Sequence, residues 1–147
     1  MGMTDGAGQD PSDEHAGLRA LVEDLLASNL LRCPERATLI LRREAAALIA
    51  TDAGVAVTIE LLPGAAHAPG SVRVRDGEDP GAEIAVRAEG MALLELAGTP
   101  LRLGLPDVMT PTGRGVLLQI ARRRIRVRGL LRHLGTVRRL STLLSAR

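Results

Sequence analysis

The chain has 147 residues, of which 46% are apolar and 24% charged, a composition typical of one globular domain. It contains no Phe, Trp or Tyr, which excludes base-stacking platforms and aromatic cages for cations. Its basic side chains are nineteen arginines with no lysine, which excludes mechanisms that need a Schiff-base or phosphate-binding lysine.

Charge is distributed unevenly along the chain. Residues 1–60 contain ten acidic residues and five arginines, whereas residues 111–147 contain ten arginines and no acidic residue. The single cysteine excludes an internal disulfide. The acidic start lacks an apolar signal segment, and no apolar run reaches the ~18 residues of a membrane-spanning helix. We therefore expect a cytoplasmic protein.

The first third of the chain predicts a leader followed by two helices. Residues 1–16 combine Gly, Asp, Ser and Pro without periodicity, which indicates a disordered acidic leader before a single domain at 17–147. Leucines at three- and four-residue steps between Leu18 and Leu30 predict a helix that ends near Pro34. Residues 35–50 predict a second amphipathic helix, with leucine and alanine on one face and charges on the other.

The middle of the chain alternates with a period of two and predicts three strands. In residues 55–62 one face holds Val55, Val57, Ile59 and Leu61, while Thr58 and Glu60 share the other, as in a half-buried strand. Residues 72–75 and 84–86 alternate in the same way and are separated by Gly, Asp and Pro. Three adjacent strands predict an antiparallel meander.

The last third predicts helices around a basic strand. Residues 89–97 have helical spacing, and Gly98 is a suitable cap; residues 101–107 alternate as an extended segment. Thr110 and Pro111 are typical of the start of a helix. Arginines at 122, 124, 126 and 128 predict one face of a strand, and residues 130–146 a final helix that buries Leu130, Leu134, Val137, Leu140 and Leu144. This order predicts an α+β fold, a mostly antiparallel sheet with helices packed on one face.

The reactive residue types do not form a catalytic or metal-binding pattern. The three histidines lie far apart in the sequence and away from Cys33, so metal-ligand spacing is absent. No histidine lies within four residues of Cys33 to act as a base for its thiol, and no serine lies in a nucleophile-elbow motif. We therefore expect no enzyme activity, no metal and no cofactor.

Several segments together carry a family resemblance. They are the run at 123–129 before a leucine-rich helix, the alternating segments 55–62, 72–77 and 82–86 with the Asp79-Pro80 turn, and the helix at 90–97 before Gly98. Over about residues 35–147 this pattern resembles the sterol-carrier-protein lipid-binding domain. The resemblance implies a mostly antiparallel sheet packed with helices around an apolar tunnel that binds sterols or acyl lipids.

The resemblance also implies which residues contact a ligand. Candidate tunnel walls are the apolar side chains on the elements that enclose the tunnel in that family, namely Met91, Leu94, Met109, Leu117, Leu134, Val137, Leu140 and Leu144. Arg124, Arg126 and Arg128 are candidate contacts for an anionic headgroup or an anionic membrane surface. A solvated strand face is the alternative interpretation of these arginines.

Two functional hypotheses remain open at this point. The first is a noncatalytic carrier of a lipid or other apolar ligand. The second is an interaction module, for a protein partner or a second copy, in which side chains fill the core; the acidic first part and basic last part of the chain favour oriented association. Nucleic acid is not expected as a partner, because the arginines have no aromatic neighbours and the rest of the chain is acidic.

Overall fold

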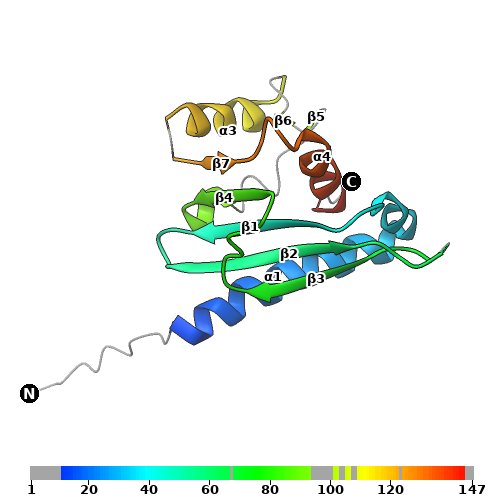
Figure 1. Cartoon of the computed structure of the whole chain (residues 1–147). Helices are drawn as coiled ribbons and strands as arrows, with labels where there is room; N and C mark the ends of the chain where they lie inside the picture. The colour runs from blue at the N-terminus through cyan, green and yellow to red at the C-terminus, as the bar shows by residue number, and fades with distance from the viewer. Residues whose placement is uncertain are drawn as a thin grey trace, which may run out of the picture.

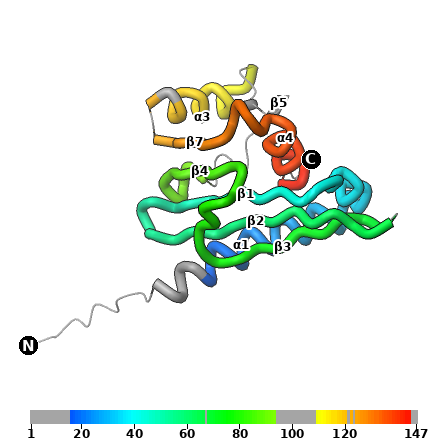
Figure 2. Tube along the Cα trace, viewed as in Figure 1, coloured from blue at the N-terminus to red at the C-terminus, as the bar shows by residue number. Residues whose placement is uncertain are grey.

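The computed structural model describes residues 11–66, 68–93, 101–102, 105–106, 109–122 and 124–144 (Figure 1, Figure 2). Residues 90–93 form a helical turn after the fourth strand. The other elements, in chain order, are α1 (Pro11–Arg32), the 3₁₀ helix η1 (Pro34–Leu39), β1 (Glu44–Ala50), β2 (Val55–Leu62), β3 (Ser71–Asp76), β4 (Ile84–Ala88), β5 (Leu101–Arg102), β6 (Leu105–Pro106), α3 (Pro111–Ala121), β7 (Arg126–Arg128) and α4 (Leu134–Leu144).

A five-stranded sheet in the order β3-β2-β1-β4-β7 organises the fold. The pairs β1–β2, β2–β3 and β4–β7 are antiparallel, and β1–β4 is parallel. Helix α1 packs against β2 and β3, while α3 lies beside β7 and α4 contacts α1 (Figure 1). The predicted α+β class, with a mostly antiparallel sheet and helices on one face, is therefore confirmed.

The main hydrophobic core lies between this helix layer and the sheet. It combines side chains from α1, β2, β4, α3 and α4, among them Leu26, Ile59, Val116 and Leu143. Ile59 and Leu143 are almost completely buried, so the elements from the two ends of the chain share one core. A smaller alanine-rich cluster around Ala47 and Ala85 covers the other face of the sheet.

The second predicted helix, at residues 35–50, is wrong. Only residues 34–39 are helical, as η1, and residues 44–50 form β1 in the middle of the sheet. Alanine favours a helix over a strand by only tenths of a kcal/mol per residue, whereas β1 gains backbone hydrogen bonds on both sides, from β2 and β4. The small side chains of Ala46 and Ala47 are buried on opposite faces of this central strand.

The predicted meander is wrong in the position of β4. This strand pairs parallel with β1 and does not touch the edge of β3. The connection after β3 passes over the face of the sheet opposite α1. Along this connection, Gly77 N donates to Ala56 O at 2.8 Å and Glu83 N donates to Ala45 O at 3.0 Å. Because this connection covers the second face, Thr58 and Glu60 are buried and β2 is not the half-buried strand that its alternation predicted.

Element boundaries also differ at the two ends of the chain. Helix α1 begins at Pro11, inside the range 1–16 that was predicted as a leader. The last helix begins at Leu134 rather than at residue 130, because Gly129 takes a left-handed conformation (φ 82°) and starts a turn. Thr136, Leu140 and Leu143 form its buried face, so Leu134, predicted as buried, is exposed.

The start of α3 agrees with its prediction. The Oγ1 atom of Thr110 accepts a hydrogen bond from Gly113 N at 3.0 Å, and Pro111 occupies the first turn. Residues 101–102 and 105–106 pair as the two short strands β5 and β6, in the segment predicted to be extended. Residues 90–93 agree with the start of the helix predicted at 89–97, and the rest of that helix and Gly98 lie outside the described residues.

Candidate functional site

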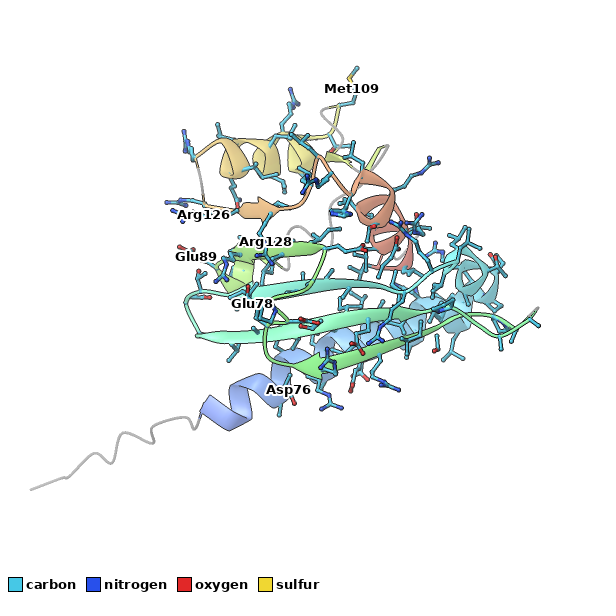
Figure 3. The ribbon with its side chains drawn as sticks, viewed as in Figure 1. Asp76, Glu78, Glu89, Met109, Arg126 and Arg128 are labelled. Atoms are coloured by element: carbon cyan, nitrogen blue, oxygen red, sulfur yellow. The ribbon has the colours of Figure 1, made fainter. Side chains whose placement is uncertain are left out.

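The predicted tunnel walls divide into two groups in the structure. Leu140 is buried in the main core, and Leu117, Val137 and Leu144 are half-buried on α3 and α4. Met91, Met109 and Leu134 are 68%, 77% and 43% exposed, and Figure 3 shows Met109 at the surface before α3. Leu94 lies outside the described residues. Four of the predicted wall residues are thus buried or half-buried on α3 and α4, and three are exposed.

The predicted arginine strand is shorter than its alternation indicated. Helix α3 continues to Ala121, and Arg122 follows as its last, capping residue. The backbone N–H groups of Arg124 and Ile125 both donate to Gln119 O, which holds this segment in a turn before β7. The prediction that Arg122 and Arg124 belong to the strand is therefore wrong. Ile125 is buried below the turn.

Arg126 and Arg128 lie exposed on β7, the edge strand beside β4 (Figure 3). A guanidinium nitrogen of Arg128 donates to Pro80 O at 3.3 Å. Arg126 lies opposite Arg87 of β4, and Arg87 forms a two-oxygen ion pair with Glu78 at 2.6 and 2.7 Å. With its neighbour Arg87 neutralised by Glu78, the side chain of Arg126 faces solvent without a hydrogen bond or ion pair to any described residue.

A buried carboxylate holds α4 against the sheet. Glu44, at the start of β1, has a side chain that is 1% exposed, and it accepts two hydrogen bonds from Arg139 of α4, one of them at 2.8 Å. Arg42 Nε donates to it at 2.7 Å and Thr136 Oγ1 at 2.9 Å. Burial raises the pKa of Glu44, but the hydrogen bonds from Arg139, Arg42 and Thr136 outweigh it and lower the pKa to about 2. Glu44 is therefore ionised in the folded protein at neutral pH.

The other end of α4 is held by polar contacts to the first helices. The buried amide of Asn29 on α1 donates to Leu143 O at 3.0 Å, and Arg36 of η1 donates to Thr142 O at 2.9 Å. These bonds satisfy carbonyl groups of the last turn, which have no partner within the helix. These contacts were not predicted from the sequence, although Asn29 in an apolar helix stripe is a signal of a buried polar contact.

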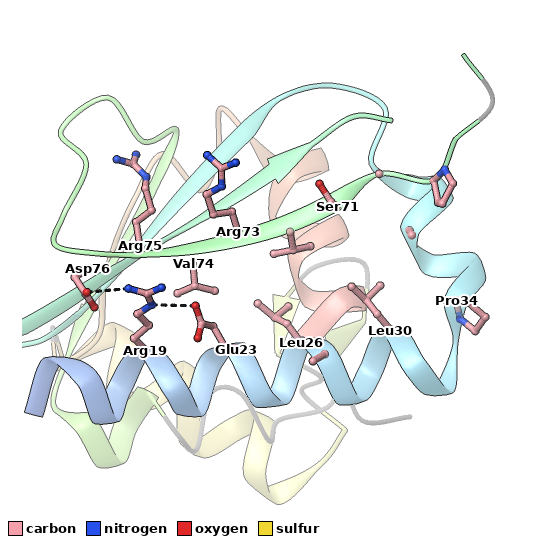
Figure 4. Close-up of a pocket in the computed structure, with 15 residues that line it drawn as sticks. Arg19, Glu23, Leu26, Leu30, Pro34, Ser71, Arg73, Val74, Arg75 and Asp76 are labelled. Atoms are coloured by element: carbon pink, nitrogen blue, oxygen red, sulfur yellow. Dashed lines mark hydrogen bonds and ion pairs between the residues drawn. The ribbon is translucent and has the colours of Figure 1, made fainter. Parts of the chain in front are cut away.

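A groove runs between α1 and the edge strand β3 (Figure 4). Its volume is about 1010 Å³, and its apolar lining includes Leu26 and Leu30 from the helix and Val72 and Val74 from the strand. At one end Arg19 bridges the two elements, because it donates to Glu23 at 2.9 Å and to Asp76 at 3.2 Å. None of the predicted wall residues lines this groove.

The described residues contain neither a clustered metal site nor a helix that could span a membrane. No group of three or more His, Cys, Asp or Glu side chains there is arranged to hold a metal ion. His133 lies 3.9 Å from Glu83 as an isolated pair. In the same part of the chain, no helix combines the length and apolarity needed to cross a membrane.

Solved structures resemble this chain, whereas comparisons of its sequence find no match. No family model matches the sequence, and no curated protein matches it. A solved structure described as "UbiJ-SCP2 Ubiquinone synthesis protein" superposes with a TM-score of 0.52 and 16% identity, over 88% of this chain and 91% of that one.

A second solved structure is the stereoselective inverting sec-alkylsulfatase Pisa1 from Pseudomonas sp. It is 18% identical with a TM-score of 0.48, over 77% of this chain but only 14% of the larger one. The first match, which spans nearly the whole of both chains, agrees with the α+β architecture described above. The chain has the sterol-carrier-protein-like (SCP2-like) fold.

Proposed function

We propose that this chain binds a lipid or another apolar molecule without transforming it. The SCP2-like fold over 88% of the chain carries the proposal. The ligand lies between α3, α4 and the helix-covered face of the sheet, against Leu117, Val137, Leu140 and Leu144. Met91, Met109 and Leu134 surround the entrance. These positions combine a protected apolar interior with large apolar side chains at the surface.

The polar contacts of α4 support this arrangement. Glu44 with Arg139 holds one part of the helix, and Asn29 with Leu143 O holds its end. A helix that is fastened by directional bonds keeps its position when apolar contacts along its length are exchanged for a ligand. The binding surface is therefore pre-organised, which reduces the entropic cost of binding.

The first experiment asks whether the purified protein carries a ligand. The protein is purified under native conditions and then denatured. We expect denaturation to release an apolar compound, which mass spectrometry should detect in a stoichiometric amount. A fluorescent acyl probe should bind the emptied protein in a saturable way. An empty protein that also fails to bind apolar probes would favour a filled core and contradict the proposal.

Leu134→Gln tests the entrance. We expect this change to weaken acyl-probe binding about tenfold, because burial of a leucine side chain contributes roughly 1.5–3 kcal/mol. Its exposed position predicts an unchanged melting temperature. The matched control is Leu39→Gln on η1, because Leu39 is 40% exposed and lies outside α3 and α4. Equal loss of binding in both variants would remove Leu134 from the site.

The exposed arginines around β7 are proposed to contact an anionic headgroup or membrane surface. Replacement of Arg124, Arg126 and Arg128 together by Gln should weaken binding to anionic vesicles, by about 1 kcal/mol per arginine at low salt. The melting temperature should change little, because exposed charges contribute little to folding. The charge-matched control replaces Arg32, Arg73 and Arg114, which are exposed on other elements. Vesicle cosedimentation that is equal for both triple variants would assign the β7 arginines to a solvated strand face.

A further inference from the structure

The strand β3 forms one edge of the sheet and is open on its outer side. Among the described residues it pairs only with β2, so half of its backbone N–H and C=O groups point away from the sheet. These groups are donors and acceptors for a further strand. Ser71–Asp76 comprises six residues, a length of about 20 Å at ~3.3 Å per residue.

The groove beside α1 follows this edge along its whole length. Every residue from Pro69 to Asp76 lines it on the strand side, and α1 lines it on the other. Figure 4 shows Leu26 and Leu30 of the helix on the same side of the strand as Val74. An added strand would therefore find backbone partners on β3 and an apolar surface for every second side chain.

The opposite side of the same strand is positively charged. Arg73 and Arg75 point away from α1 in Figure 4, on the face of the sheet that also holds Glu60. Arg75 donates to Glu60 at 2.8 Å and lies 3.4 Å from Asp79. The side chain of Arg73 is exposed and forms no hydrogen bond or ion pair with a described residue. The edge therefore carries the guanidinium of Arg73, which has no acidic partner among the described residues, next to the guanidinium of Arg75.

This charge pattern opposes pairing with a second copy of the chain. In an antiparallel pair that continues a sheet, residues directly opposite each other point to the same face. Two β3 strands related by a twofold axis overlap over most of their length in two registers, which pair residues 71–75 or residues 72–76 with the same residues of the other copy. Both registers place Arg73 or Arg75 opposite an arginine of the other copy. Like charges directly opposite each other are destabilising, whereas acidic residues at these positions would be attracted.

We propose that β3 accepts an extended segment of another protein as an additional strand, and that this segment alternates apolar with acidic side chains. The apolar side chains enter the groove against Leu26, Leu30 and Val74. The acidic ones lie beside Arg73 and Arg75. Backbone hydrogen bonds provide the affinity, and the alternation provides the specificity. This interaction is independent of the proposed lipid binding, which uses α3 and α4.

The direct test is binding of a synthetic strand. The probe is acetyl-Val-Glu-Val-Glu-Val-Glu-Trp-amide, and the control peptide carries Lys in place of Glu. The protein has no Trp, Tyr or Phe, so the emission anisotropy of the peptide's Trp has no protein background. We expect saturable binding of the acidic peptide that weakens with added salt, and no binding of the Lys peptide. Equal binding of both peptides, or of neither, would overturn the proposal.

Backbone methylation distinguishes strand addition from attraction between charges. Two versions of the acidic peptide are N-methylated at alternate residues, one at the Val positions and one at the Glu positions. In an added strand, the N–H groups of every second residue face β3, and those of the residues between them face away. Methylation therefore blocks pairing only when it falls on the set that faces β3. We expect one methylated version to lose binding and the other to keep it. Retention or loss of binding in both versions would exclude an added strand.

Arg73→Gln tests the charge at the edge. We expect this variant to bind the acidic peptide about fivefold more weakly, a typical upper effect of one exposed ion pair. The control is Arg114→Gln on α3, because Arg114 is also exposed and its replacement changes the net charge equally. Equal weakening by both changes would contradict a role for this edge. Light scattering on the peptide-free protein provides a second check, since a dimer disrupted by Arg73→Gln would assign β3 to self-association.

Discussion

Arg139→Met should lower the free energy of unfolding by about 3 kcal/mol at pH 7, because it leaves the buried carboxylate of Glu44 without its two-bond partner. Thr136 and Arg42 remain as donors, but Arg42 is largely exposed and holds the carboxylate less firmly. The chain has no Phe, Trp or Tyr whose fluorescence could report unfolding. Unfolding in urea is therefore followed by far-ultraviolet circular dichroism.

The pH dependence of this effect has a definite sign. The folded state holds the pKa of Glu44 at about 2, below the ordinary value of 4.5. Between these values the unfolded chain binds more protons than the folded one, so the stabilisation is complete above pH 4.5 and is lost as the pH falls toward 2. The shift corresponds to about 3 kcal/mol. Arg139→Met raises the pKa of Glu44, and the stabilities of the wild type and the variant should converge in this window.

Arg138→Met is the matched control for this experiment. Arg138 precedes Arg139 on α4 but is exposed, and its side chain forms no hydrogen bond or ion pair with a described residue. We expect a change within about 0.5 kcal/mol, as for other exposed substitutions. A similar loss in both variants, or a loss in Arg139→Met that persists unchanged at pH 2.5, would contradict the role assigned to Glu44.

Gly129→Ala should destabilise the protein by about 4 kcal/mol, through two effects at one position. Gly129 has φ 82°, a left-handed conformation that is unfavourable for alanine. A Cβ atom at this position would also lie 2.0 Å from the backbone oxygen of Glu83. To relieve this clash the turn after β7 must move, and the pairing of Arg128 with Ala85 at the sheet edge would be disturbed.

Gly77→Ala separates these two effects. Gly77 has a similar φ of 89°, but a Cβ atom there meets nothing within 4 Å. It therefore carries only the conformational cost, about 1–2 kcal/mol. Thermal unfolding of both variants measures the difference. If Gly77→Ala were as destabilising as Gly129→Ala, the close contact with Glu83 would not explain the effect.

Local patterns in the sequence were sufficient for several elements. The three- and four-residue leucine spacing predicted α1, Thr110 and Pro111 predicted the start of α3, and the period of two predicted β2, β3 and β4. In each case the signal is contained in neighbouring residues, because periodicity and capping depend on local backbone geometry. The family resemblance extended these elements to the correct overall fold.

The candidate ligand site was predicted only in part. Eight wall residues followed from the resemblance, and four of them lie half-buried or buried on α3 and α4. The groove at β3 was not predicted, because its lining comes from α1 and from a strand about forty residues later. A surface of this kind arises from the packing of distant segments, and no local pattern marks it.

The sequence by itself determined the class of fold, the absence of aromatic and lysine chemistry, and the basic character of the last quarter of the chain. The tertiary structure decided that residues 44–50 are a central strand, that β4 lies beside β1, and that Glu44 is buried with Arg139. Helix propensity acts within a few residues and contributes tenths of a kcal/mol, whereas strand pairing and the burial of charge depend on partners up to 95 residues away. Where the two conflict, as in β1, the long-range contacts prevail.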